Sequence, residues 1–182
     1  NPLEVRAFRS PRGIHRTKWY RRSEWFGCAC CPSNLSRLLA SLSGYFITYD
    51  KESVALHLFD HLETAVPLAE GEVPLLVETD YPKTGRIKIT VGKNRPLPAF
   101  KLRVRVPGWC KEYSLSGVEC AVSEENGYLV LEREWQPSDC IVLDFPMQIK
   151  RIYAHAKIHY NLGRVALSRG PVVYCIEDVD FG

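Results

Sequence analysis

The sequence lacks several features that mark common functional classes. It contains no apolar run long enough to span a membrane and no signal-peptide pattern at its N-terminus. A phosphate-binding glycine-rich loop, a dinucleotide fingerprint, a Gly-x-Ser-x-Gly elbow and an internal repeat are also missing from its 182 residues. These absences exclude the P-loop, dinucleotide-binding and α/β-hydrolase classes, and we expect no membrane partner.

A strong charge of either sign is lacking as well, since the net charge is only +3. Basic residues do cluster in residues 6–22, where seven lysines and arginines are interleaved with Trp19 and Tyr20. A nucleic-acid-binding patch has this composition, and so does an ordinary solvated loop. Because the run is short, we interpret it as a loop and expect no nucleic-acid partner.

Regular cysteine spacing is absent, although the sequence has seven cysteines. An odd number without a repeated spacing argues against a disulfide scaffold and for a reducing compartment, so we expect a cytoplasmic location. The chain opens on Asn1 and has no initiator methionine. We therefore expect it to be a piece of a longer protein.

What the sequence does contain is a cluster of three cysteines, Cys28, Cys30 and Cys31, directly ahead of a helical pattern. These thiols are a poor disulfide framework, because a bridge between adjacent cysteines is strained and a bridge from Cys28 to Cys30 closes almost no loop. Leucines spaced at i, i+3, i+4 and i+7 predict a helix over about residues 33–43. They are Leu35, Leu38, Leu39 and Leu42.

This spacing places Cys30 and Cys31 at or just before the N-terminus of the helix. The unpaired N–H groups and the positive end of the helix dipole favour an anion there, so a thiol is shifted toward the thiolate that attacks carbon or binds zinc. The alternative is that the cysteines are small core residues at the helix entry, because free cysteine is among the most buried side chains. Both interpretations stay open at this point.

Residues upstream of the thiols could complete a pocket, namely His15, Trp19, Tyr20, Glu24 and Trp25. Aromatic faces stack on sugar rings, and histidine can ligate a metal or move protons. Each of them taken alone is more often a surface or packing residue. Further on, His57 and His61 are four residues apart, but the strand pattern places His57 opposite its apolar neighbours, so we treat both as non-ligands.

The chain after the helix has the pattern of β-structure. Segments 86–91 and 100–107 alternate between polar and apolar residues, which is typical of strands with one face in a core and the other in water. Their even spacing and polar turns predict an antiparallel β-sandwich. Further strands are indicated at 45–49, 54–59, 73–82, 127–131 and 140–145.

Four longer motifs follow one another along the chain. They are WFGCACCPSNLSRLLASL at 25–42, ETDYP at 78–82, RVPGWC at 105–110 and GRVALSRGPVVY at 163–174. In this order they resemble glycoside hydrolase family 127, the β-L-arabinofuranosidase family. Ser33 stands where the family usually has proline, at a helix start where serine is well suited.

The resemblance implies a mainly β fold in which a loop and one α-helix, left from an (α/α)6 barrel, precede a jelly-roll-like antiparallel β-sandwich. By this interpretation residues 1–46 end the catalytic barrel, residues 47–150 form the sandwich and residues 151–182 begin a second one. The chain would then be the C-terminal fragment of a bacterial enzyme, with the remainder of the barrel as its partner.

The resemblance also implies chemistry. Cys30 would be the nucleophile and a zinc ligand, Cys31 a second zinc thiolate, and His15 and Trp25 would contact an L-arabinofuranoside-containing carbohydrate. The family's acid/base glutamate lies upstream, and Glu24 does not match its motif. With two of four Zn²⁺ ligands, the isolated chain is expected to bind zinc weakly or not at all and to be inactive.

Two other functions remain under consideration. A non-catalytic β-sandwich could bind carbohydrate or act as a scaffold, with Trp19, Trp25 and Trp109 as stacking surfaces. A small structural zinc protein could be built on Cys28, Cys30 and Cys31. Whatever the function, the leucine stripe of the helix is expected to associate with a second copy or with the sandwich when the barrel is missing.

Overall fold

The computed structural model describes residues 28, 30–92, 97 and 99–176. The chain divides into two compact units, residues 1–42 and residues 43–182, and each is described here by itself. The loop expected ahead of the helix, with His15, Trp19 and Trp25, lies outside the described residues. In the part that is described, no helix is both long and apolar enough to cross a membrane.

The first unit contains helix α1 (Cys30–Ser41), which begins three residues earlier than about residue 33. Pro32 fits in its first turn because the N–H groups of that turn have no partner within the helix. The side chains of Leu35, Leu38 and Leu39 are 57%, 48% and 61% exposed, and α1 has no buried residue. A 3-10 turn, η2 (Leu42–Tyr45), follows α1 near the expected end at about residue 43.

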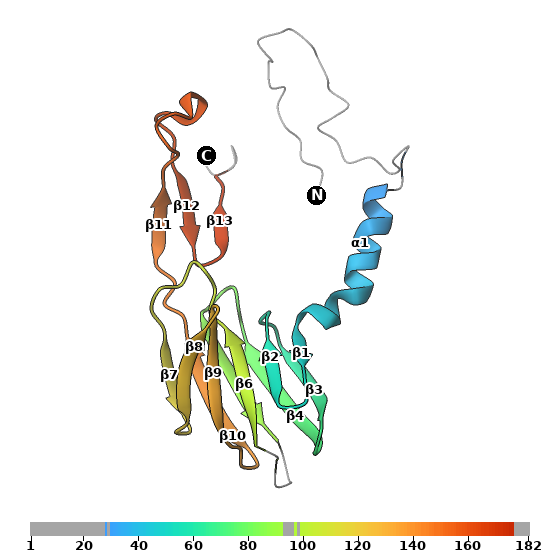
Figure 1. The fold of residues 1–182 in the computed structure, drawn as a ribbon. Coiled ribbons are helices and arrows are strands. Elements are labelled where there is room, and N and C mark those ends of the chain that lie inside the picture. The colour runs from blue at the N-terminus through green and yellow to red at the C-terminus, as the bar shows by residue number, and fades with distance from the viewer. Residues whose placement is uncertain (1–27, 29, 93–96, 98, 177–182) are drawn as a thin grey trace. The chain divides into compact units, whose positions relative to one another are not determined.

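The second unit is built on two five-stranded sheets (Figure 1). The first sheet has the order β1-β2-β6-β9-β8 and consists of β1 (Ile47–Tyr49), β2 (Ser53–Leu56), β6 (Ala99–Arg105), β9 (Tyr128–Glu134) and β8 (Ala121–Glu125). The second has the order β3-β4-β5-β10-β7 and consists of β3 (Leu62–Leu68), β4 (Gly71–Thr79), β5 (Arg86–Val91), β10 (Asp139–Asp144) and β7 (Ser114–Gly117). The chain is therefore mainly β after one helix, as the sequence predicted.

One strand pair departs from the antiparallel expectation. β2 and β6 run parallel, with Ser53 opposite Lys101 and Leu56 opposite Val104. Between these strands the chain crosses to the second sheet, forms β3, β4 and β5 there, and then returns. A parallel pair requires such a long connection, because a tight turn can join only antiparallel neighbours. The first sheet is consequently mixed.

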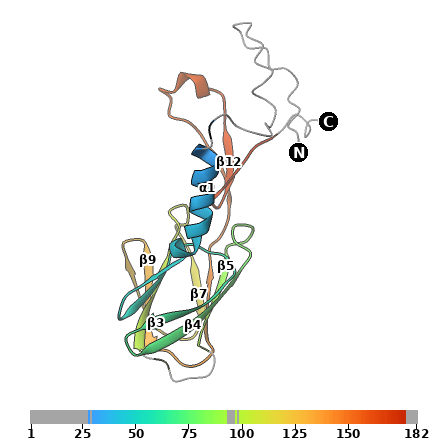
Figure 2. The same cartoon turned by 90° about the vertical axis from the view of Figure 1, so that its right-hand side faces the viewer.

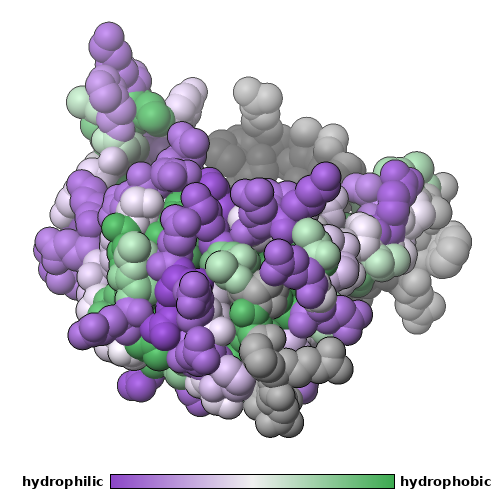
Figure 3. Space-filling model, turned by 60° about the horizontal axis from the view of Figure 1, so that its bottom comes forward, coloured by the Kyte–Doolittle hydropathy of each residue, from purple (hydrophilic) through white to green (hydrophobic). Residues whose placement is uncertain are grey.

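The two sheets pack face to face around one apolar core (Figure 2). Alternation supplies the core, since Leu102 and Val104 of β6 and Ile87 and Ile89 of β5 all point inward and are at most 1% exposed. Trp135 is fully buried, and its Nε1–H donates to the carbonyl oxygen of Phe100 over 2.9 Å. Hydrophilic side chains predominate on the side of the molecule seen in Figure 3, where its lower end in Figure 1 comes forward.

A third, smaller sheet follows the sandwich with the order β11-β12-β13. Its antiparallel strands are β11 (Ile149–Ile152), β12 (Ala166–Arg169) and β13 (Val172–Tyr174), with a short 3-10 turn, η3 (His159–Asn161), between β11 and β12. Lys150 Nζ donates to the carbonyl oxygen of Trp109 over 3.1 Å. Arg169 Nη1 donates to that of Lys83 over 2.9 Å. These two bonds tie the third sheet to loops of the sandwich.

Candidate functional site

The cysteines that the sequence singled out lie at the start of α1. Cys30 and Cys31 are its first two residues, and their Sγ atoms are 3.7 Å apart. Both thiols are free and exposed, and so is that of Cys28. Ser33 Oγ donates to the carbonyl oxygen of Cys30 over 3.2 Å, which holds the first turn together. The structure therefore presents two thiols side by side at a helix N-terminus.

The separation of these sulfur atoms fits a shared zinc ion. Two thiolates bound to tetrahedral zinc at ~2.3 Å each lie about 3.8 Å apart, and the observed distance is 3.7 Å. Among the described residues, no group of three or more His, Cys, Asp or Glu side chains could hold a metal ion. Cys30 and Cys31 thus suit half of a zinc site, and the other ligands would have to come from elsewhere.

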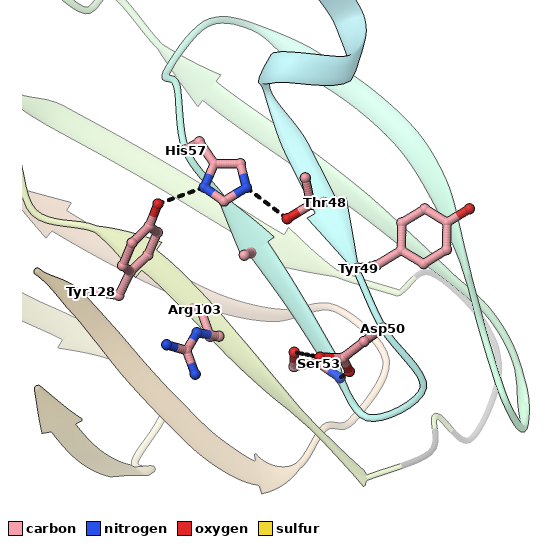
Figure 4. A pocket seen from close by; sticks show the side chains of 8 residues that line it. Thr48, Tyr49, Asp50, Ser53, His57, Arg103 and Tyr128 are labelled. Carbon is pink, nitrogen blue, oxygen red and sulfur yellow. Dashed lines mark hydrogen bonds between the residues drawn. The ribbon is translucent and has the colours of Figure 1, made fainter. Parts of the chain in front are cut away.

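A second feature is an open pocket of about 320 Å³ on the outer face of the first sheet (Figure 4). Ala55 of β2 projects to this face between its buried neighbours Val54 and Leu56. Its small side chain, surrounded by larger ones, leaves the hollow. The pocket is lined by Thr48, Tyr49, Asp50, Ser53, Ala55, His57, Arg103 and Tyr128.

His57, which directly follows β2, bonds to residues of two other strands, β1 and β9, across this pocket. Its Nε2 is hydrogen-bonded to Thr48 Oγ1 and its Nδ1 to Tyr128 Oη, each over 2.7 Å. Burial, and to a smaller extent the charge of Arg105, lowers the pKa of His57. Because both ring nitrogens of His57 are hydrogen-bonded, its side chain acts as a structural link between β1 and β9. The strand pattern in the sequence placed His57 on the face opposite its apolar neighbours. The hydrogen bond to Tyr128 could not be predicted from that pattern, because Tyr128 is 71 residues further along the chain.

Asp50 and Arg103, the two other charged side chains of the pocket, also have partners. Asp50 accepts hydrogen bonds from the backbone N–H groups of Glu52 and Ser53 over 2.8 and 2.7 Å, which lower its pKa and close the turn between β1 and β2. The Arg103 guanidinium pairs with Glu125 over 3.2 Å and lies 5.8 Å from the centre of the Tyr128 ring. The pocket has a single carboxylate among its lining residues and lacks a second for acid–base catalysis.

Trp109 is the one predicted stacking residue that the described part of the chain contains. It is partly buried against the core, where its Nε1–H donates to Tyr81 Oη over 3.3 Å and its ring meets Phe145 edge-on at 6.3 Å. Trp109 therefore packs at the edge of the core and is not a free stacking surface. The other proposed pocket residues, His15, Trp19 and Trp25, fall outside the described residues.

Comparison with known protein families identifies two matching domains. Residues 53–147, just over half of the chain, match the middle domain of the GH127 β-L-arabinofuranosidases. Residues 149–182 match the C-terminal domain of glycoside hydrolase family 127. The two matches meet at the end of the sandwich, directly ahead of β11.

Individual relatives agree with these matches. A non-reducing end β-L-arabinofuranosidase of Bifidobacterium longum is 33% identical over 170 residues, which are 87% of this chain. The crystal structure of a GH127 β-L-arabinofuranosidase from Geobacillus stearothermophilus T6 is 35% identical over 98% of the chain, with a TM-score of 0.78. A solved GH127 β-arabinofuranosidase is 31% identical over 87% of the chain, with a TM-score of 0.76.

The chain is much shorter than these relatives. It spans 25% of the length of the Bifidobacterium protein and 29% of the Geobacillus structure. The likeness nevertheless covers the sandwich and continues into the third sheet. By its matching domains and its similarity to these enzymes, the chain belongs to glycoside hydrolase family 127.

Proposed function

We propose that this chain supplies the nucleophile and two metal-binding thiolates of a retaining glycoside hydrolase that releases β-L-arabinofuranose. The observation that carries the proposal is the pair of exposed thiols, 3.7 Å apart at the start of α1, in a chain of this family. Cys30 is the nucleophile, and Cys30 and Cys31 are the residues that would hold zinc. Bound zinc would keep the sulfur atoms as thiolates at neutral pH.

The reaction follows the double displacement of retaining glycosidases. In the first step the Cys30 sulfur forms a bond to the anomeric carbon while the bond to the leaving oxygen breaks, and a carboxylic acid protonates that oxygen. In the second step water, deprotonated by the same carboxylate, displaces the sulfur. Two inversions restore the original configuration. The acid is expected from a glutamate outside this chain, consistent with the upstream location that the resemblance implies.

The position of the thiols at a helix N-terminus supports the first step. The N–H groups of the first turn of α1 have no partner within the helix and favour an anion beside them. Exposure of both thiols leaves the sulfur atoms accessible to a sugar. The pocket around His57 has Asp50 as its single lining carboxylate, so an ordinary carboxylate pair is not supported in that pocket.

The alternative of a carbohydrate-binding or scaffolding module has less support. Its stacking surface in the described part of the chain would be Trp109, and this ring packs on Phe145 at the core. A structural zinc protein built on Cys28, Cys30 and Cys31 would need the three thiols to converge. Among the described residues they do not form a metal-holding group. We therefore favour the hydrolase.

The proposal is tested by an assay of arabinose release from an aryl β-L-arabinofuranoside, with zinc and a reductant present. The reading frame that contains this chain should turn over the substrate, and Cys30→Ser should lower kcat on the order of 10³-fold or more. Mass spectrometry of the stalled enzyme should find a pentosyl group on the Cys30 peptide. Cys175 directly follows β13, and its thiol is also free and exposed. Cys175→Ser is therefore the matched control and should retain activity.

The isolated 182-residue chain provides a second arm of this experiment. It should bind zinc weakly, because two thiolates are half of a tetrahedral site, and it should give no turnover. Substantial turnover by the isolated chain, or full activity of the Cys30→Ser enzyme, would contradict the proposal.

A further inference from the structure

The pocket on the outer face of the first sheet has a shape that the strand register produces. Thr48 of β1 lies opposite Ala55 of β2, and Ala55 lies opposite Arg103 of β6, so the three side chains form one row on this face. The methyl group of Ala55 is the floor of the pocket, and the longer side chains beside it are walls. Its volume of about 320 Å³ is at the lower end of the ~300–1,000 Å³ range of small-molecule pockets, which suits one sugar residue.

The charges around this pocket favour a neutral ligand. Arg103 is paired with Glu125 over 3.2 Å. Backbone hydrogen bonds lower the pKa of Asp50, so this side chain is an ionised carboxylate at neutral pH. Burial lowers the pKa of His57 and favours its uncharged form. An anion in the pocket would meet the Asp50 carboxylate, and a cation would meet the Arg103 guanidinium.

Asp50 and Arg103 retain hydrogen-bonding capacity for such a ligand. Asp50 accepts from the backbone N–H groups of Glu52 and Ser53 and from Ser53 Oγ, the last over 2.8 Å, whereas a carboxylate offers about four acceptor positions. Among the described residues, Arg103 donates one N–H group to Glu125, and a guanidinium has about five. Figure 4 shows Asp50 and Arg103 with β2 between them. An acceptor and several donors therefore flank the floor of the pocket.

We propose that this pocket binds one neutral sugar residue of pentose size. Neighbouring hydroxyl groups of a sugar both donate and accept hydrogen bonds, so one donates to Asp50 while the next accepts from Arg103. The C–H groups of the sugar ring then contact Ala55 and the ring of Tyr128, which also lines the pocket. Sugar binding here does not depend on the proposed function, because the lining residues of the pocket include no cysteine.

The experiment is a titration of the 182-residue chain with L-arabinose, followed by backbone-amide NMR. Amide signals of residues 48–57 should shift and saturate, with a dissociation constant on the order of 1 mM, because a ligand of so few atoms makes few contacts. D-galacturonate has the ring configuration of L-arabinopyranose and adds a carboxylate. It should bind more weakly, because its charge faces Asp50. Tighter binding of D-galacturonate would refute a neutral-sugar site.

Two variants test the floor and the wall of the pocket. Ala55→Leu fills the hollow and should weaken L-arabinose binding by about tenfold or more. Ala65→Leu, at an exposed alanine of β3, is the matched control and should bind like the parent chain. Asp50→Asn keeps an oxygen that accepts from the turn but removes its charge. It should weaken L-arabinose binding about fivefold and narrow the gap between L-arabinose and D-galacturonate.

The outcomes for this pocket and for the proposed function can be told apart. Cys30→Ser should bind L-arabinose like the parent chain, although it removes the proposed nucleophile. Shifts confined to α1, no saturable shifts at all, or parent-like binding by Ala55→Leu would overturn the sugar site. Failure of arabinose release by the full reading frame, with L-arabinose still bound at residues 48–57, would count against the proposed function alone.

Discussion

At the scale of single residues, His57 shows how a polar side chain can hold a sheet together from its outer face. It follows β2, and its two ring nitrogens reach Thr48 of β1 and Tyr128 of β9. Its imidazole also meets the Tyr128 ring edge-on, with 5.6 Å between the ring centres. Because burial opposes a positive charge, the folded state favours the neutral ring.

This burial predicts a pH dependence of stability. The pKa of His57 lies below its ordinary value of 6.5 in the folded chain, so the unfolded chain binds the proton first as the pH falls. The free energy of unfolding should therefore decrease as the pH falls through about 6.5, until the pH lies below the folded pKa. Urea unfolding at a series of pH values measures this decrease.

His57→Gln should reduce the loss of stability between about pH 7 and pH 5, because it removes the titrating group. Each variant is compared with itself at the two pH values, so a lost hydrogen bond does not enter the comparison. His155→Gln changes an exposed histidine and serves as the control. An equal pH dependence in His57→Gln and the parent chain would refute the argument.

At the scale of elements, the turn between β4 and β5 depends on a close approach of two backbones. A Cβ added to Gly85 would stand 1.9 Å from the carbonyl oxygen of Phe145, and that carbonyl belongs to backbone that cannot rotate away. The Phe145 N–H in turn donates to the Gly85 carbonyl oxygen over 3.0 Å. Glycine is needed here for space.

Gly85→Ala should consequently lower the free energy of unfolding by about 1–3 kcal/mol or more, because the two segments must move apart. Gly108→Ala is the matched control, since nothing lies within 4 Å of a Cβ added there, and its effect should stay within about 0.5 kcal/mol. Denaturant unfolding of both variants measures the difference. Equal stability of the two would show that the close approach relaxes without cost.

The elements also show which strands a sequence reveals. Alternation predicted β5 and β6, and the strands indicated at 45–49 and 54–59 contain β1 and β2, which pair with Ile47 opposite Leu56. Three strands of the sandwich carried no recognisable signal, and all of them are sheet edges: β3, β7 and β8. β3 contains Pro67, and every residue of β8 is exposed. An edge strand buries little, so its apolar pattern is weak, and it tolerates proline.

At the scale of the whole molecule, the leucine stripe of α1 is the feature with the largest consequence for association. Leu35, Leu38 and Leu39 are about half exposed or more and lie on one helix face. Neighbouring exposed apolar side chains favour self-association in water. The chain spans 25–29% of the length of its relatives, and we expect another part of a longer protein of the family to cover this face.

Replacing Leu35 and Leu39 together by glutamine should shift the isolated chain toward the monomer. Sedimentation velocity over a dilution series should show a concentration-dependent coefficient for the parent chain and a constant, smaller one for the double variant. Leu162→Gln, at a leucine that is 59% exposed outside this helix, is the control and should behave like the parent. A parent chain that stays monomeric at every concentration would contradict the prediction.

The sequence by itself determined the helix with its thiols, the β character of the rest, and the family, because these depend on local spacing and contiguous motifs. Only the tertiary structure decided the parallel pairing of β2 with β6, the bridge from His57 to Tyr128, and the 3.7 Å between the Cys30 and Cys31 sulfur atoms. The two sheet features join residues far apart in the chain, and local periodicity carries no information about such partners. The sulfur distance depends on side-chain rotamers in the first turn of α1, which adjacency in sequence does not specify.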